Sequence, residues 1–478
     1  MTQAKSFGEL NFSNAQIGDA RRTKRLVTLA DQMHARPGGT LPQKFRSPAD
    51  LQAFYRLMAR DEVTHGAMIA PHREATLKRI AETADPILVL HDTTELDFTN
   101  HESLEDLGQI GCGTRKGYIT HNSLAVHSVT REPMGLLNQI LHRRETVSKS
   151  ETRAERRKRS TRESRLWLQG PLPLPADRQL VDVCDRGADT FEFLQFEVAS
   201  GRRFVIRSSH NRRIFVGHEG TSAADAGNLH EHIRSLAPAG TWQLEVTSKN
   251  ELRRGRGKQK KKRVQRIRRT ANMAVSFAQI QIRQSKCKGG SKTKPLTLWA
   301  VRVWEIDPPA GQERLEWILL TNERVASFTA AYRVVGWYEC RWIVEEFHKA
   351  MKTGCRVESP QFTSEDRLQP CIALLSIVAI TLLQLRDASR RWDAKERAAT
   401  EVVSPTYVEV LSHWRHKKVK LDWSVHDFFY ALARLGGHLN RKNDSQPGWQ
   451  VLWEGWKELL PMANGYDIAK SKYYKKCG

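Results

Sequence analysis

The segment YECRWIVEEFHKAMKTG, residues 338–354, crowds acids, bases and a phenol into one short stretch. Placed on a helix with about 100° per residue, it divides into a polar and an apolar face. The polar face, whose groups can bind phosphate or a metal ion, carries Tyr338, Arg341, Glu345, His348, Lys349 and Lys352. The apolar face carries Cys340, Ile343, Val344, Phe347, Ala350 and Met351. Glu346 is rotated about 100° from Glu345, so Glu345 is the acid expected to do chemistry.

Two further acids stand at the ends of apolar, strand-like runs. PILVLHD ends in Asp92, and QLVDVCD ends in Asp185 just before an expected helix. In sheets covered by helices, acids at strand ends face the crevice where ligands bind. Neighbouring aspartates repel unless a cation lies between them, and hard ions such as Mg²⁺ prefer carboxylate oxygens. Together with Glu345, the two aspartates could hold two metal ions for phosphoryl displacement. The alternatives are structural: a single acid after a strand is more often a cap or a loop residue, and the polar face of a helix can simply be exposed to water.

The charge balance points to the class of substrate. Lysine and arginine outnumber aspartate and glutamate, 77 to 53, which leaves a net charge of +24 and a pI near 9.9. Such an excess favours a polyanion, because basic side chains gain affinity by displacing counterions from phosphates. An anionic membrane surface is the alternative. The apolar run 371–385 is shorter than a bilayer requires, so we expect a buried helix there, and the N-terminal residues lack the apolar stretch of a signal peptide.

The cysteines indicate the compartment. There are seven of them, an odd number, and none form a CxxC pair. This argues against a zinc site and against a disulfide framework, and it is typical of a protein in a reducing cytoplasm.

The chain is too long for one ordinary core, so two or three domains are expected from its 478 residues. Residues 1–64 have helical periodicity. Residues 65–390 alternate strand-like and helical runs, which predicts an α/β domain, and consecutive strands between about 202 and 320 predict a β-rich insertion. Residues 391–478 are helical again and rich in tryptophan.

Local signals agree with this division. Asp19 and Ser47 can cap two helices near the N-terminus. Eight runs rich in β-branched and aromatic residues are predicted strands: 86–92, 123–129, 179–185, 203–209, 242–248, 273–282, 296–304 and 316–321.

Two charge runs could contact nucleic acid. Residues 253–270 hold eleven basic side chains and no acid, which favours phosphate contact, with ordering on nucleic acid. Residues 143–165 hold ten basic side chains against four glutamates, and a solvated surface is the more usual role of such a mixed run.

Three blocks of the sequence resemble the DDE blocks of bacterial cut-and-paste transposases. They are HDTT at 91–94, VCDRGAD at 183–189 and the segment 338–354. The last block contains the Tyr-x2-Arg-x3-Glu-x6-Lys signature of the insertion-sequence-four family in full, as Tyr338, Arg341, Glu345 and Lys352. The likeness continues through GDARRTKRL, FYRLMAR, RFVIRS, EWILLT and ALARLGG, and so covers nearly the whole chain.

The resemblance implies an RNase H-like catalytic domain with a β-rich insertion, between a helical N-terminal DNA-binding domain and a helical C-terminal dimerisation domain. It implies that Asp92, Asp185 and Glu345 bind two Mg²⁺ ions, for which Mn²⁺ is expected to substitute. In that family water cuts at the transposon end, the freed 3′-hydroxyl forms a hairpin, and the opened end joins target DNA. A homodimer that pairs two ends of double-stranded DNA, in the bacterial cytoplasm at the nucleoid, is therefore expected.

The resemblance also assigns DNA contacts. Arg207, Tyr338, Arg341 and Lys352 match phosphate or hairpin contacts, and Trp317 matches a tryptophan that stacks near a flipped base. The alternative for Trp317 is a structural role, as a core residue of the predicted strand EWILL. Three arginines of the first domain match residues that bind the transposon end, with a solvated helix face as the alternative: Arg21, Arg25 and Arg56. His348 and Lys349 join the DNA contacts because of their place beside Glu345.

This sequence departs from the family pattern at two positions. Ser209 stands where a lysine is expected, which puts one strand contact in doubt, and Gly187 replaces an acid after Asp185. Two other functions remain open. A metal-dependent nuclease or resolvase of the same fold would cut DNA without joining strands. A non-catalytic DNA-binding regulator of transposition would not need the acid triad, which is intact.

Overall fold

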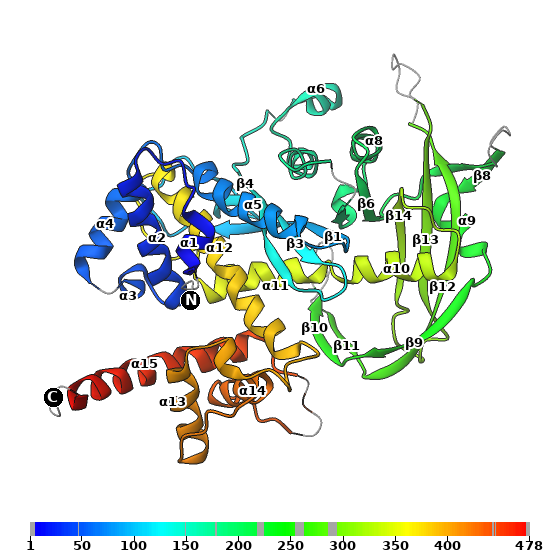
Figure 1. Cartoon of the computed structure of the whole chain (residues 1–478). Helices are drawn as coiled ribbons and strands as arrows, with labels where there is room; N and C mark the ends of the chain where they lie inside the picture. The colour runs from blue at the N-terminus through cyan, green and yellow to red at the C-terminus, as the bar shows by residue number, and fades with distance from the viewer. Residues whose placement is uncertain are drawn as a thin grey trace. The chain divides into compact units, whose positions relative to one another are not determined.

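The computed structural model describes residues 5–45, 47–148, 150–176, 179–217, 224–253, 262–284, 294–441, 444 and 446–474. It shows a mixed α/β protein with a large mixed sheet and many helices (Figure 1). The chain divides into two compact units, each described here by itself. Unit 1 comprises Met1–Ile87, Asp92–Leu166 and Trp342–Gly478, and unit 2 comprises Leu88–His91 and Trp167–Arg341.

Unit 1 begins with helices, as the sequence predicts. They are α1 (Phe7–Phe12), α2 (Ala20–Ala35), α3 (Leu41–Lys44), α4 (Pro48–Met58) and α5 (His65–Ala81). The Asp19 side chain accepts a hydrogen bond from the backbone N–H of Arg22, and the Ser47 side chain accepts one from Asp50. Both predicted caps are confirmed, and each satisfies an N–H group that the start of a helix leaves unpaired.

The strands of unit 1 lie next to the long helix α12 (Glu365–Arg390). They are the second part of β1 (Ile87–Asp97), β2 (Gly108–Gln109), β3 (Lys116–His127) and β4 (Pro133–His142). Strand β3 pairs antiparallel with β2 and with β4, and both α5 and α12 pack against β4. The chain then forms α6 (Arg153–Lys158), the 3₁₀ turn η1 (Glu163–Arg165) and the start of α7 (Leu166–Gln169).

Helix α12 is the core helix of unit 1. Among the described residues it is the one helix long and apolar enough to cross a membrane, but 78% of its apolar window is buried inside the structure. The residues of the predicted buried run from Cys371 to Ile380 are all buried. The prediction of a buried helix is therefore confirmed.

Unit 1 ends in a second group of helices. They are η4 (Ala399–Glu401), α13 (Pro405–His416), α14 (Val425–Leu435) and α15 (Trp449–Tyr474), the last drawn in red beside α13 and α14 (Figure 1). Trp449 and Trp453 are buried, and the ring of Trp456 packs against Phe428 and Tyr407 at centroid distances of 6.2 and 5.2 Å. Packing within this unit therefore accounts for these three tryptophans.

Unit 2 is built on the larger part of the sheet. Its strands run in the spatial order β1, β5 (Leu180–Cys184), β6 (Arg203–Arg207), β14 (Glu316–Thr321), β13 (Leu296–Ile306), β12 (Arg269–Ile282), β7 (Arg213–Val216) and β8 (Ala224–Asn228). Strands β5 and β6 are parallel, and the pairs from β6 to β8 are antiparallel. Strand β9 (Gly240–Val246) also pairs with β12. β10 (Lys249–Arg253) and β11 (Lys262–Arg266) form a separate two-stranded sheet.

Few helices accompany these strands. After β5 come the 3₁₀ turn η2 (Arg186–Ala188) and α8 (Phe191–Ala199), and α9 (Leu229–Ser235) follows β8. Helix α10 (Phe328–Glu339) packs against β6, β12 and β13 (Figure 1). The described part of 202–320 contains β6 to β14 and the single helix α9, so the predicted β-rich stretch is confirmed.

The prediction of one continuous helix over 338–354 is wrong. Helix α10 ends at Glu339, α11 (Trp342–Lys349) begins three residues later, and a π-helical turn, η3 (Ala350–Gly354), follows it. The backbone N–H groups of Cys340 and Arg341 bond to the carbonyl groups of Trp337 and Tyr338, three residues back instead of four. This 3₁₀ pattern tightens the turn and ends α10.

The break changes which residues share a helical face. Tyr338 and Arg341 belong to unit 2, whereas Glu345 and Lys352 belong to unit 1. The four residues therefore do not lie on one continuous helix. The apolar pattern was correct, because every residue assigned to that face is 0–1% exposed: Cys340, Ile343, Val344, Phe347, Ala350 and Met351.

Candidate functional site

Asp185 stands where a parallel strand ends, in unit 2. It follows β5 and caps the turn η2, and its Oδ1 accepts the backbone N–H of Gly187 at 2.6 Å. The side chain is half-buried. A small residue is required at 187, because a Cβ there would lie 2.8 Å from the Trp167 ring and 3.0 Å from Asp185 Oδ1. The turn therefore orients one oxygen of the carboxylate.

Basic and aromatic residues gather near Asp185 in the same unit. Arg207, the last residue of β6, lies close to Tyr338 on α10; Arg341 is near both of them, and Arg186 is near Arg207. The Trp317 and Tyr338 rings stand edge to face with centroids 5.2 Å apart. Unit 2 thus brings together Asp185 and all four of the DNA contacts that the sequence predicts within it, and it adds Arg186, which was not predicted.

The protonation states in this group follow from burial and neighbouring charge. Burial raises the pKa of Tyr338, the positive charges of Arg341 and Arg207 oppose that rise, and the Asp185 carboxylate adds to it. Burial also lowers the pKa of Arg207. Tyr338 therefore stays a neutral phenol at physiological pH, able to donate one hydrogen bond and to accept others.

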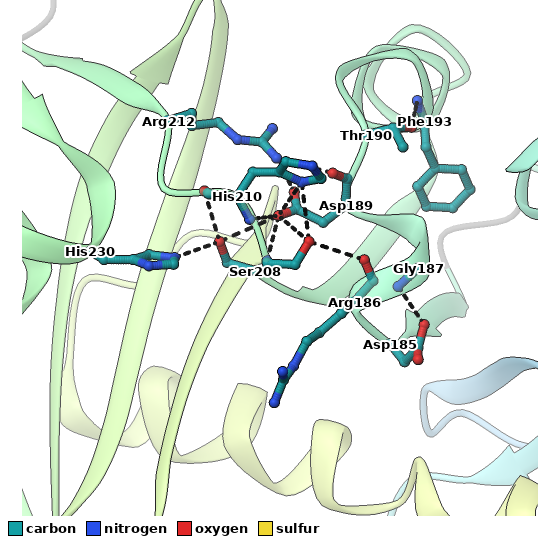
Figure 2. A network of polar contacts seen from close by, with 11 residues as sticks. Asp185, Arg186, Gly187, Asp189, Thr190, Phe193, Ser208, His210, Arg212 and His230 are labelled. Atoms are coloured by element: carbon teal, nitrogen blue, oxygen red, sulfur yellow. Dashed lines mark hydrogen bonds and ion pairs between the residues drawn. The ribbon is translucent and has the colours of Figure 1, made fainter. Parts of the chain in front are cut away.

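A second, fully buried carboxylate in unit 2 was missed by the sequence reading. Asp189 Oδ2 accepts the backbone N–H groups of Ser209, at 2.6 Å, and His210, at 2.9 Å, and its Oδ1 forms an ion pair with Arg212 (Figure 2). Asp189 belongs to the same block as Asp185, but its partners lie about twenty residues further along the chain. Sequence spacing alone gave no signal for that contact.

Strands β1 and β5 are joined by a buried polar pair within unit 2. His91 Nε2 lies 2.8 Å from Asp182 Oδ1, and Arg202 Nη1 lies 3.6 Å from the other oxygen of Asp182. The nearby carboxyl of Glu197 is fully buried, and burial together with the charge of Asp182 raises its pKa well above the usual range. These contacts anchor the strand residue that directly precedes Asp92.

Asp92 itself belongs to unit 1, on β1. Its side chain is half-buried, and its Oδ1 accepts the backbone N–H of Thr93 at 2.8 Å. The hydroxyl of Thr93 lies 3.2 Å from Nδ1 of the buried His121 on β3. Neighbouring strands therefore fix the backbone on which this carboxylate stands.

Glu345 lies on α11 in unit 1, where its side chain is exposed. The exposed Lys349 lies on the same helix, and the half-buried Lys352 lies on the π-helical turn after it. The half-buried Glu346 forms an ion pair with Arg386 at 2.6 Å. Glu346 thus has a structural partner on α12.

His348, a residue of α11, is buried. Its Nε2 lies 3.1 Å from Asn122 Nδ2 on β3. Asn122 also accepts a hydrogen bond from Gln139, which donates to Ser376 on α12. This chain of buried side chains connects the helix that carries Glu345 to β3, β4 and α12.

The donor chemistry of the three acids suits a hard cation. All three ligands would be carboxylates, and the two aspartates each have one oxygen oriented by a neighbouring backbone N–H. Among the described residues, no three His, Cys, Asp or Glu side chains form a group that could hold a metal ion. Asp92 and Glu345 belong to unit 1 and Asp185 to unit 2, so neither unit contains the whole set.

The remaining predicted contacts lie on the first helices or in charge runs. Arg21 and Arg25 on α2, and Arg56 on α4, have exposed side chains, whereas Arg22 pairs with Glu62 at 2.9 Å. The basic run at 253–270 lies partly outside the described residues, which omit 254–261. In the run 143–165, Arg144 and Arg159 form ion pairs with Glu163 and Glu151, as expected for a mixed surface.

Comparison with known families gives one match. Residues 4–63 match the family model described as transposase DNA-binding. The matched range contains α1 to α4 and includes the exposed arginines Arg21, Arg25 and Arg56. The match supports a transposase that binds DNA.

Proposed function

We propose that this chain is a DNA transposase that binds the terminal inverted repeats of its element, excises the element and joins its 3′ ends to target DNA. The observation that carries the proposal is the match of residues 4–63 to a transposase DNA-binding family. The group formed by Asp185, Arg207, Trp317 and Tyr338 supports it, because a carboxylate beside phosphate-binding and base-stacking side chains suits cleavage of a polynucleotide. The proposed affiliation is the insertion-sequence-four family, in which the chain resembles the transposase of transposon five.

In this proposal the catalytic domain is RNase H-like, and Asp92, Asp185 and Glu345 hold Mg²⁺. The bound ions would supply charge stabilisation for the attacking and leaving oxygens of phosphoryl transfer. The backbone contacts from Thr93 and Gly187 hold the two aspartates in a fixed orientation, so little reorganisation is needed when DNA binds.

The basic residues would bind the scissile strand. Arg207 and Arg341 present guanidinium groups, which suit phosphate because they can donate two hydrogen bonds at once. Tyr338, kept neutral by burial, can donate its hydroxyl proton to a phosphate oxygen. Lys352 and Lys349 add positive charge near Glu345 along the chain. Their role is to hold the phosphate in line with the attacking oxygen.

Trp317 would hold a base that leaves the helical stack. Its half-buried ring is fixed by the edge-to-face contact with Tyr338, which leaves an oriented aromatic surface. Stacking of this kind tolerates any base and stabilises binding by roughly 1–3 kcal/mol. Formation of a hairpin at the transposon end requires such an extruded base.

The test uses the DNA that flanks this reading frame in its genome. A fragment that carries the inverted repeat is incubated with the protein and Mg²⁺, and the products are separated on a denaturing gel. We expect a nick at the repeat, then a hairpin, and then joining to a target plasmid. Equal cutting in EDTA would contradict metal-dependent cleavage, and cutting without joining would favour a nuclease or resolvase instead.

A further inference from the structure

The buried carboxylate of Asp189 is well placed to act on the site without touching DNA. It lies in unit 2, is 0% exposed, and belongs to none of the predicted contacts. We propose that Asp189 is a positioning residue, which holds the segment after β6 against the turn after β5 and so fixes Arg207 and Asp185 relative to each other. This inference rests on the proposed function, because it assigns those two residues to the reaction.

The contacts of Asp189 tie two separate segments together. Its own backbone N–H bonds to the carbonyl of Arg186, and the carbonyl of Asp185 accepts the N–H of Ala188, so Asp189 is part of the turn that carries Asp185. Its Oδ2 accepts the N–H groups of Ser209 and His210, which come directly after β6 and Arg207. One side chain therefore links the ends of both strands.

Further polar contacts surround Asp189 and the segment after β6 (Figure 2). Arg212 bonds to Asp189 through both the carboxylate and, at 3.1 Å, the backbone carbonyl. The hydroxyl of Ser209 lies 3.3 Å from the carbonyl of Arg186, and that of Ser208 lies 3.1 Å from Nε2 of His230 on α9. A catalytic triad is not formed, because His210 approaches both the Ser209 hydroxyl, at 3.1 Å, and Asp189 Oδ2, at 3.5 Å, through the same ring nitrogen, Nδ1.

Charge is essential to this role. The carboxylate accepts backbone N–H groups at one oxygen and a guanidinium at the other, so both oxygens act as acceptors. Asparagine has the same shape, but its NH₂ group must face one of these donors. Replacement would leave buried donors unpaired and release the segment 208–212, which moves the guanidinium of Arg207.

The test compares two buried acid–arginine pairs of the same unit. Asp189→Asn removes the link between the two strand ends. Glu305→Gln is the matched control, because Glu305 is 1% exposed and binds Arg269 through both oxygens, at 2.7 and 2.8 Å, between β13 and β12. For both variants we would measure thermal unfolding, affinity for the inverted repeat in EDTA, backbone hydrogen exchange over 205–212, and single-turnover cleavage at saturating DNA across Mg²⁺ concentrations.

For Asp189→Asn we expect the segment 205–212 to exchange faster and the cleavage rate to fall roughly 100-fold, as small misplacements of reacting groups do. Affinity for the repeat should change by less than about threefold, because residues 4–63 provide it. Glu305→Gln should lose stability but cleave at nearly the normal rate. Equal cleavage by the two folded variants, or a loss of DNA affinity that matches the loss of rate, would overturn the proposal.

If Asp189→Asn does not fold, Arg212→Gln takes its place. This change leaves the backbone contacts of Asp189 intact and removes only the guanidinium, so we expect an intermediate loss of cleavage with retained binding. Normal cleavage by a folded Arg212→Gln protein with accelerated exchange at 205–212 would contradict the positioning role. Failure of the wild-type protein to cleave at all would instead refute the proposed function, and the exchange measurement would still report on the link.

Discussion

Glu346 forms an ion pair with Arg386, whose side chain is 3% exposed, with 2.6 Å between Oε2 and Nη1. Arg386 also bonds to Asp387 and lies over the ring of Trp342, at 5.5 Å from its centroid. Glu345, the preceding residue, is exposed on the same helix. The two adjacent glutamates therefore have different surroundings, and their substitution should separate catalysis from stability.

Glu345→Gln should abolish all strand cleavage and leave DNA binding intact. The amide keeps the size of the side chain but removes the charge that a metal ligand needs. Glu346→Gln should cleave DNA but unfold more easily, by roughly 1–3 kcal/mol, because a buried guanidinium loses a partner. Cleavage at saturating DNA, a binding assay and thermal unfolding would be measured for both. Normal cutting by Glu345→Gln beside an inactive Glu346→Gln would reverse the assignment.

Tyr338→Phe should slow cleavage about 10- to 100-fold, because it deletes a donor next to Arg207. The edge-to-face contact with Trp317 depends on the ring and should survive, so hairpin formation should be less affected than the first nick. Trp317→Ala is the complementary variant, in which nicking should persist while hairpin formation fails. Single-turnover gels that resolve nick and hairpin would check both expectations, and a uniform loss at every step would contradict them.

Neutralising the basic run at 253–269, except for Arg269, which already pairs with Glu305, should weaken DNA binding and flatten its salt dependence. Each phosphate contact that is lost should reduce the slope of log affinity against log salt by about 0.9. Fluorescence anisotropy on a duplex at several salt concentrations measures the slope. Removal of the paired Arg144 and Arg159 is the control, since their glutamate partners already neutralise them. An unchanged slope would indicate that the run is only a solvated loop.

The active assembly should contain two protomers and two DNA ends. Trp449, Trp453 and Trp456 pack within unit 1, so the prediction of a dimer depends on the family resemblance alone. Mass measurement of the complex by light scattering, with DNA ends of two lengths, would count both components. A fully active complex of one protomer would contradict the prediction.

Acid should destabilise unit 1 through His72. This residue is buried, its Nδ1 lies 2.7 Å from Asn11 Oδ1 on α1, and its Nε2 accepts the N–H of Leu136 on β4. Burial lowers its pKa from 6.5 to about 3. Between these values the unfolded chain binds a proton that the native state does not, so stability falls as pH falls below about 6.5.

The slope from one such group approaches about 1.4 kcal/mol per pH unit. Urea unfolding between pH 4 and 8 would measure this slope. The His72→Gln variant should be less stable at pH 7, but its free energy of unfolding should depend less steeply on pH. An equally steep acid dependence in that variant would assign the effect to other groups.

Much of the fold follows from local patterns in the sequence. Each of the eight predicted strands coincides with a strand of the structure, because buried strands concentrate β-branched and aromatic residues. Strand β4 was missed, because PMGLLNQILH begins with proline and glycine and contains two amides. Those amides include Gln139, which is buried in the polar network beneath α11, where tertiary contacts satisfy it.

The candidate site was predictable only in part. Asp185, Arg207, Trp317 and Tyr338 were found because their motif is linear, and unit 2 brings them together. Asp189 and Arg186 were missed, since their roles depend on contacts between segments far apart in the chain. The break after Glu339 was missed for a different reason. A change from four-residue to three-residue hydrogen bonds leaves no mark in hydrophobic periodicity.

The turn at Cys340 and Arg341 also matters for protein engineering. The chain passes from unit 2 to unit 1 at this turn. The turn therefore divides the Tyr-x2-Arg-x3-Glu-x6-Lys signature, although the signature is continuous in the sequence. A chimera of two related enzymes that is joined there would combine Tyr338 and Arg341 of one parent with Glu345 and Lys352 of the other. Crossovers placed before α10 or after η3 keep all four signature residues from one parent. Libraries built with those junctions should therefore yield more active recombinants.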